Sequence, residues 1–240
     1  MVLLGNQALN RMLSESLARI ERVGLIPIVV SNDPSKVLEL GRQFLDLGLD
    51  VVEVTMRREG AMDVLMRLCK ELPQLLVGAG TIFSVSAAKQ AVQAGARFIA
   101  SPHVDEEMVA YCMENKIVPC PGGFTPTEVN RAILAAKEQS PISLDLPLLM
   151  KIFPAASGGP GHIRALRDVF PSTRFVPTGG VNVSNLADYI RAGAFAVGGT
   201  WVCRADLVDN GNFDTIARLT QEALSIIKKT KSSLEPQPHL

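Results

Sequence analysis

Several features are scarce in this chain, and each scarcity excludes a class of protein. No apolar run approaches the ~20 residues that a membrane-spanning helix needs. Residues 1–22 are interrupted by Arg11, Glu15 and Arg19, which indicates an amphipathic helix and not a secretory signal. The 24 basic and 24 acidic residues balance to a formal net charge of zero. Neither nucleic-acid binding nor a polybasic membrane anchor is therefore expected.

Metal-ligand and disulfide patterns are also missing. The four cysteines (Cys69, Cys112, Cys120 and Cys203) form no C-x-x-C pair, which favours reduced thiols in a cytoplasmic protein. The three histidines show no H-x-x-x-H or H-E-x-x-H spacing. We therefore expect no dedicated metal site.

What the chain does contain is an alternation of short apolar runs with helix-like segments. The predicted strands are residues 26–30, 51–56, 75–81, 98–102, 117–121, 150–154, 174–179 and 194–201. They carry apolar residues on both faces, as parallel strands covered on both sides do. This pattern predicts a (β/α)8 TIM barrel with an N-terminal helix, for which ~250 residues are typical. An open doubly wound sheet is the alternative.

No composition shift marks a domain boundary. Residues 1–231 are expected to form one barrel domain, and residues 232–240 a flexible tail. Helices are predicted at residues 34–47 and 184–192, the second capped by Ser184. Residues 137–149 form an unusually long connection with two prolines.

One lysine has an unusual setting. Among the nine lysines, only Lys151 lies inside a short apolar run, residues 148–154. Burying an ammonium group is costly and lowers the pKa of an amine, because the charged form loses hydration. A neutral amine can attack a ketone and form a Schiff base. A structural lysine paired with a carboxylate is the alternative.

The strand at residues 51–56 carries two charged candidates. Side chains alternate along a strand, so Glu53, Thr55 and Arg57 are expected to share one face, directed into the barrel. A structural ion pair between Glu53 and Arg57 is one interpretation. In the other, Glu53 transfers protons and Arg57 binds a substrate carboxylate.

Glycine-rich segments end three of the predicted strands. Gly78-Ala79-Gly80-Thr81 would allow a ligand to approach the backbone, or would simply pack tightly. Two Gly-Gly turns after the last two strands would expose backbone N–H groups, as a barrel phosphate site requires. These segments are Pro177-Thr178-Gly179-Gly180 and Gly198-Gly199-Thr200-Trp201.

Together these motifs resemble a known family. V-E-V-T-M-R, G-A-G-T, P-G-G-F-T-P-T-E, K-I-F-P-A, P-T-G-G and G-G-T-W occur in the order and spacing of the 2-keto-3-deoxy-6-phosphogluconate (KDPG) and 4-hydroxy-2-oxoglutarate (KHG) aldolases. The resemblance implies a class I aldehyde-lyase with a (β/α)8 barrel. It also implies no metal or cofactor, a homotrimer and a place in the Entner–Doudoroff pathway.

The resemblance also implies roles for individual residues. The catalytic pair would be Lys151, as the Schiff-base lysine, and Glu53, as general acid and base. The substrate contacts would be Arg57 and Thr81 at the pyruvate carboxylate, with Pro102, Phe153 and Thr178. The phosphate would be held by Gly179, Gly180, Gly198, Gly199 and Thr200.

The chain departs from the family pattern at several positions. The family usually has Thr where this chain has Arg58, often S-P-G where it has Ser101-Pro102-His103, and commonly Ser at Thr200. Arg58 and His103 would add cations near the mouth of the site. Ala156 and the 137–149 connection are also atypical.

The expected substrate is KDPG, cleaved to pyruvate and glyceraldehyde 3-phosphate. KHG and the galactonate epimer of KDPG remain alternatives, although the resemblance implies that a threonine at 178 suits the gluconate isomer. A noncatalytic phosphosugar-binding barrel and a metal-dependent aldolase are the alternatives from other classes.

Overall fold

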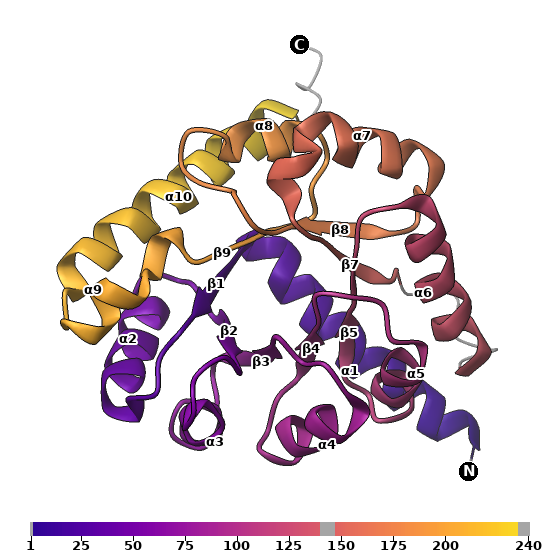
Figure 1. The fold of residues 1–240 in the computed structure, drawn as a ribbon, viewed down its shortest axis with the longest axis horizontal. Helices are drawn as coiled ribbons and strands as arrows, with labels where there is room; N and C mark the ends of the chain where they lie inside the picture. The colour runs from indigo at the N-terminus through magenta and orange to yellow at the C-terminus, as the bar shows by residue number, and fades with distance from the viewer. Residues whose placement is uncertain (1, 140–146, 235–240) are drawn as a thin grey trace.

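Short parallel strands line the centre of the molecule, and helices cover them from outside (Figure 1). This computed structural model describes residues 2–139 and 147–234. The strands are β1 (Leu25–Val29), β2 (Val51–Thr55), β3 (Leu76–Gly80), β4 (Phe98–Ala100), β5 (Val118–Cys120), β6 (Gly122–Gly123), β7 (Leu149–Ile152), β8 (Arg174–Pro177) and β9 (Val197–Gly199). Every residue of β1, β2 and β3 is buried, as expected for strands covered on both faces.

The helices follow the strands in the predicted alternation. They are α1 (Val2–Val23), α2 (Pro34–Asp46), α3 (Ala61–Glu71), α4 (Val85–Gln93), α5 (Glu106–Glu114), α6 (Pro126–Gln139), α7 (Gly159–Val169), α8 (Leu186–Arg191), α9 (Ala205–Asp209) and α10 (Phe213–Leu234), with short 3-10 helices η1 (Ala155–Ser157) and η2 (Trp201–Cys203). Side-chain caps start several of them. The Asp33 carboxylate, for example, accepts hydrogen bonds from two backbone N–H groups of α2. None of the helices in the described part of the chain is long and apolar enough to span a membrane.

The strands form a curled, all-parallel arrangement in two hydrogen-bonded pieces. The order is β5-β4-β3-β2-β1-β9 in the first and β6-β7-β8 in the second. A parallel bridge between Thr178 and Gly198 joins them at one side. At the other side the chain passes from β5 to β6 through Pro121. A curled α/β sheet is thus confirmed, whereas a continuous ring of eight strands is not seen.

Pro121 explains why the strand predicted at 117–121 ends at Cys120 and is followed by the separate strand β6. Proline has no backbone N–H and cannot complete a ladder on both sides. Its carbonyl still accepts a hydrogen bond from Lys151 N–H at 2.9 Å. Beyond it, β6 pairs with β7 and places Gly122 beside Lys151. The division therefore fixes the position of the lysine relative to the preceding strand.

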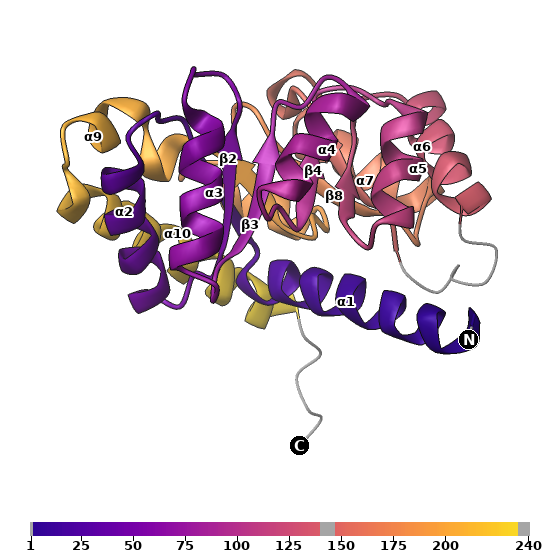
Figure 2. The same ribbon diagram turned by 90° about the horizontal axis from the view of Figure 1, so that it is seen from below.

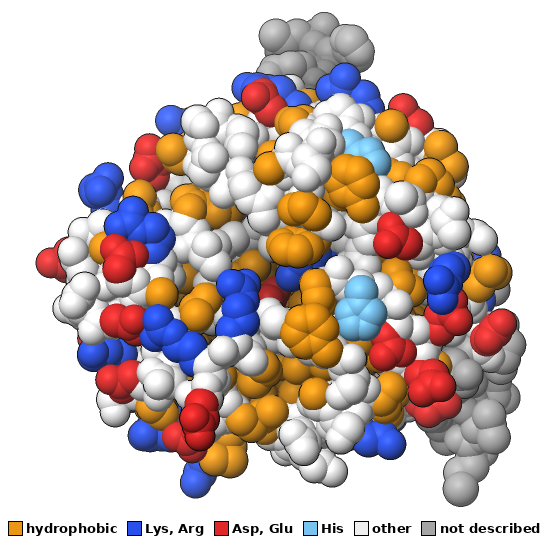
Figure 3. Space-filling view, in the orientation of Figure 1, with side chains coloured by type: hydrophobic (Ala, Val, Ile, Leu, Met, Phe, Trp, Pro, Cys, Tyr) orange, Lys and Arg blue, Asp and Glu red, His pale blue; other side chains and the backbone are white. Residues whose placement is uncertain are grey.

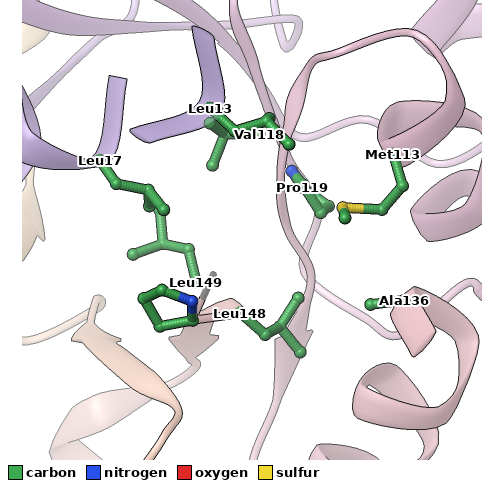
Figure 4. Close-up of a pocket in the computed structure, with 9 residues that line it drawn as sticks. Leu13, Leu17, Met113, Val118, Pro119, Ala136, Leu148 and Leu149 are labelled. Carbon is green, nitrogen blue, oxygen red and sulfur yellow. The ribbon is translucent and has the colours of Figure 1, made fainter. Parts of the chain in front are cut away.

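The helix α1 lies across the amino-terminal ends of the strands (Figure 2). Asp50, just before β2, accepts hydrogen bonds from Arg19 Nε at 3.0 Å and Arg22 Nη2 at 2.6 Å. Leu13 and Leu17 face Val118 and Leu149 across an apolar cavity of only about 40 Å³ (Figure 4). The helix α1 therefore covers the amino-terminal ends of β5 and β7, close to this small cavity.

Several boundaries differ from the predictions. Asn185, and not Ser184, is the N-cap of α8, and the Ser184 hydroxyl instead donates to Asn182 Oδ1 at 2.6 Å. The predicted turn at Gly198-Gly199 is part of the strand β9. Gly198 also forms the parallel bridge to Thr178. The tail predicted from residue 232 is helical through Leu234, since α10 continues to that residue. Of the 137–149 connection, residues 140–146 lie outside the described ranges.

Candidate active site

A cavity of about 560 Å³ opens at the carboxyl ends of the strands. Hydrophobic side chains gather around a hollow near the centre of this face (Figure 3). Its lining contains most of the predicted site residues, namely Lys151, Arg57, Thr81, Pro102, Phe153, Thr178, Gly179, Gly180, Gly199 and Thr200. Ile28, Phe83, Val181 and Trp201 complete it. Residues from strands far apart in the sequence therefore meet in one cavity, as parallel strands predict.

Lys151 projects from β7 into this cavity and is almost fully buried. Its side chain is 8% exposed, and its Nζ lies 3.8 Å from Glu53 Oε1. The same Nζ is 5.6 Å from the centre of the Phe153 ring. The lysine thus has a carboxylate partner and also borders an open cavity, so it combines the two settings that the sequence left open.

Glu53 lies beside the lysine, on β2. Its side chain is 6% exposed. The register places it next to Gly78, and a methyl group at Gly80 would collide with its carboxylate. A methyl group at Gly78 would collide with the Phe98 ring. The glycines of the G-A-G-T segment are therefore explained by tight packing, and Gly80 makes room for the carboxylate.

Arg57 does not share the setting of Glu53. β2 ends at Thr55, so the alternation of side chains no longer applies at position 57, and Arg57 is exposed. The two residues form no ion pair in the described structure, where the partner of Glu53 is Lys151. Arg57 Nε instead donates to Thr81 Oγ1 at 3.4 Å. The ion-pair interpretation is therefore wrong, and Arg57 instead lines the cavity that Lys151 borders.

Thr81 is held in an unusual backbone conformation at the end of β3. Its φ is 62°, a region that β-branched residues rarely adopt. Its hydroxyl lies 2.6 Å from the hydroxyl of Thr55. Strain of this kind persists only where the surroundings impose it, and it concentrates at functional sites. The result is a guanidinium and a hydroxyl presented side by side at the cavity wall.

The glycine-rich ends of β8 and β9 form another part of the cavity wall. Gly179 and Gly180 have φ values of 87° and 88°, which favour glycine. A methyl group at Gly180 would also collide with Ala156. Gly198 is not in the cavity lining; it faces the buried Thr178, and the two residues form the bridge between the sheets. Gly199, Thr200 and Trp201 border the cavity from β9 onward.

Cys120 lies near Lys151 and Glu53, and no sequence pattern singled it out as a site residue. It is 3% exposed, on β5. Burial raises the pKa of its thiol to about 12. The charge of Glu53 also raises this pKa, whereas the charge of Lys151 lowers it. A thiol with so high a pKa stays protonated and unreactive near neutral pH.

The two extra cations expected near the mouth have other contacts. Both Nη atoms of Arg58 donate to the carboxylate of Asp209, each at 2.9 Å. This arginine holds the pKa of Asp209 below its ordinary value. Arg58 therefore ties the segment after β2 to α9. His103 stacks on Phe83 at the rim, with 6.0 Å between ring centres.

The P-G-G-F-T-P-T-E segment contains a capping box that starts α6. The Glu128 carboxylate accepts hydrogen bonds from the N–H groups of Phe124 and Thr125, at 2.9 and 2.8 Å. The T-x-x-E spacing is the sequence signal for this arrangement. These bonds lower the pKa of Glu128.

This capping box leads to a pH-dependent prediction. A carboxylate with a lowered pKa stabilises the fold above its ordinary value of 4.5, and the contribution is lost as pH falls through the lower folded value. Glu128→Ala should reduce the free energy of unfolding by about 1 kcal/mol at pH 7. Urea unfolding at several pH values should show that the difference in unfolding free energy between the unmodified chain and Glu128→Ala becomes smaller below pH 4.5. The control Glu128→Gln keeps an acceptor oxygen and should recover part of the loss. A difference that stays constant down to pH 2 would contradict this role.

Comparison with known proteins places the site in context. A family model described as "KDPG and KHG aldolase" matches residues 17–219. The chain is 34% identical over 210 residues to a 2-dehydro-3-deoxy-phosphogluconate aldolase from Treponema pallidum, covering 87% of this chain and 95% of that protein. A crystal structure of a 4-hydroxy-2-oxoglutarate aldolase/2-deydro-3-deoxyphosphogluconate aldolase from TTHB1 superposes with a TM-score of 0.77 at 32% identity, covering 88% and 98% of the two chains.

A second similar structure carries a covalent ligand. The KDPG aldolase from Legionella pneumophila was captured with pyruvate as a covalent carbinolamine intermediate. It has a TM-score of 0.77 and 29% identity to this chain, over 87% of this chain and 97% of that one.

Proposed function

This chain belongs to the KDPG and KHG aldolase family, and from that membership we propose that it cleaves KDPG reversibly to pyruvate and glyceraldehyde 3-phosphate. The observation that carries the proposal is the setting of Lys151. Its amine lies 3.8 Å from a buried carboxylate, at a cavity large enough for a small substrate. A nucleophile and a proton-transfer group are thus adjacent, as Schiff-base chemistry requires.

The proposed reaction begins at the lysine. The neutral amine of Lys151 attacks the ketone carbon, and loss of water gives an imine that is then protonated. The protonated imine accepts the electron pair of the carbon–carbon bond that breaks. Glu53 takes the proton of the substrate hydroxyl, through a water molecule, and the aldehyde leaves. Glu53 returns a proton to the enamine, and hydrolysis of the imine releases pyruvate and the free lysine.

The two walls of the cavity suit the two ends of the substrate. Arg57 and Thr81 lie next to each other and offer a guanidinium and a hydroxyl to the pyruvate carboxylate. The backbone around Gly179 and Gly180, together with Gly199 and Thr200, suits a phosphate, because glycines leave N–H groups accessible. Phe153, whose ring centre lies 5.6 Å from the lysine nitrogen, would pack beside the imine.

The finer architecture and setting are part of the proposal. The Thr178–Gly198 bridge and the passage through Pro121 support one closed (β/α)8 barrel, with β5 and β6 acting as a single strand. We further propose a single barrel domain that assembles as a homotrimer in the cytoplasm and serves the Entner–Doudoroff pathway, as the family resemblance implies.

A coupled pyruvate-release assay tests the proposal most directly. It should be run with KDPG, its galactonate epimer and KHG, and we expect the highest kcat/KM with KDPG. Incubation with pyruvate and borohydride should add covalent mass to Lys151, which a noncatalytic binding barrel would not gain. Activity should survive a strong chelator, whereas a metal-dependent aldolase would lose it. Absence of both turnover and covalent trapping would refute the aldolase function.

Thr200 provides a test of the phosphate position. Thr200→Val removes one hydroxyl donor. The binding of the KDPG transition state, calculated from kcat/KM, should therefore weaken by ~1–3 kcal/mol. Cleavage of KHG, which has no phosphate, should hardly change. Thr200→Ser is the matched control and should retain activity, because it keeps the hydroxyl. Equal losses on both substrates would place Thr200 outside the phosphate site.

A further inference from the structure

A second cavity, of about 370 Å³, opens at the other end of the molecule. Thr173, just before β8, and Phe195, just before β9, line it, so it lies at the amino-terminal ends of these strands. Three basic side chains converge on it from separate elements: Arg167 of α7, Arg174 of β8 and Lys231 of α10. Glu21 of α1 is the one acidic residue in the lining. The lining therefore carries an excess of positive charge.

These three cations lack carboxylate partners. Within the described ranges none of them forms an ion pair, whereas Arg19, Arg58 and Arg191 each do. Lys231 Nζ donates to the backbone carbonyl of Glu21, and Arg174 Nη1 to that of Pro171 at 3.4 Å. Burial lowers the pKa of Lys231, and the charge of Glu21 only partly opposes this. Several N–H donors at the cavity thus remain without an anionic partner.

Helix ends explain part of this arrangement. Arg167 and Lys231 lie in the last turns of α7 and α10, where the helix dipole favours a cation. The dipole does not explain Arg174, which begins a strand and whose guanidinium lies 5.8 Å from the centre of the Phe195 ring. It also does not explain why the three side chains meet at one cavity.

We propose that this cavity binds a small phosphate-bearing anion. Arginine presents a planar fork that matches phosphate oxygens, and two arginines with a lysine can surround one such group. Thr173 supplies a hydroxyl to the same lining; it is 3% exposed and forms no side-chain hydrogen bond within the described ranges. The volume is at the lower end for small-molecule sites, and Pro171 and Phe195 offer apolar contact to an organic body.

The location gives this site a separate role. β8 and β9 run from the cavity to the glycine-rich wall of the candidate active site. A ligand here would occupy the opposite end of the same strands and would not compete with substrate. The inference is independent of the proposed aldolase activity, because none of the residues lining this cavity lines the other.

Equilibrium dialysis of the full chain with radiolabelled inorganic phosphate at low ionic strength tests the proposal. We expect the unmodified chain to bind one phosphate at this cavity. In the double variant Arg167→Gln/Arg174→Gln the dissociation constant of that site should rise about tenfold or more. Arg164→Gln is the matched control, since Arg164 is an exposed cation on α7 outside the cavity. It should bind phosphate like the unmodified chain. Thr200→Val should leave this site unchanged.

Further arms identify the ligand and guard against misfolding. Displacement of the label by 2-glycerophosphate at lower concentration than by unlabelled phosphate would indicate a phosphate monoester; equal potency would indicate free phosphate. If the double variant does not fold, Arg167→Gln alone serves, because this side chain is exposed. Unchanged phosphate binding in the cavity variants overturns the proposal. An equal loss in Arg164→Gln also overturns it, because binding would then reflect surface charge alone.

Discussion

Lys151→Ala is expected to abolish cleavage of both KDPG and KHG. The value of kcat should fall by about 10⁴–10⁶-fold, as is usual when a catalytic nucleophile is removed. The physical reason is that the imine supplies the electron sink for the bond that breaks, and the described cavity contains no other lysine. Pyruvate with borohydride should no longer add mass to the protein. Turnover and trapping should be measured on one preparation.

The control for this variant must separate chemistry from charge. A lysine that only neutralises buried Glu53 would be replaced in function by another cation, since removal of one partner of a buried pair is what destabilises the fold. Lys151→Arg keeps the positive charge but cannot form an imine. We therefore expect it to be as inactive as Lys151→Ala, and more stable to heat. Near-normal activity in Lys151→Arg, or labelling of a different lysine, would show that the mechanism is wrong.

Much of this site could be predicted from the sequence because strand parity and strand ends are local properties. Lys151 stands out among apolar neighbours, and the periodicity of β2 correctly directs Glu53 inward. The same periodicity does not extend to Arg57, which lies beyond the last residue of the strand. Local rules hold only as far as the element to which they apply.

Contacts between distant segments could not be predicted in this way. The ion pair between Arg58 and Asp209 joins residues 151 positions apart, and nothing in either segment indicates the other. The same is true of the cavity formed by Arg167, Arg174 and Lys231, since each residue alone is typical of a helix end or strand start. The arrangement of the strands likewise depends on the division at Pro121 and on a single bridge at Thr178, details that hydrophobic patterning does not encode.

Glu53→Gln should separate formation of the imine from cleavage. Glutamine has nearly the shape of glutamate, so it should fit the space that Gly80 leaves beside the carboxylate. Lys151 should then still form an imine with pyruvate, and borohydride should still trap it. The amide cannot accept the proton of the substrate hydroxyl, so kcat should fall by ~10²–10⁴-fold, the usual contribution of a general acid–base group.

The pair of measurements distinguishes a proton-transfer role from a structural one. If Glu53 serves only to balance the charge of Lys151, its removal should impair folding or reduce the fraction of protein that borohydride traps. The turnover per trapped site, which is kcat divided by that fraction, should then stay unchanged. If it transfers protons, trapping persists while turnover per trapped site falls. Glu53→Asp is the informative control, because it keeps the carboxylate but withdraws it from the lysine by one methylene. We expect it to retain more activity than Glu53→Gln, whereas a loss of kcat well below 10²-fold in Glu53→Gln would assign the carboxylate a structural role.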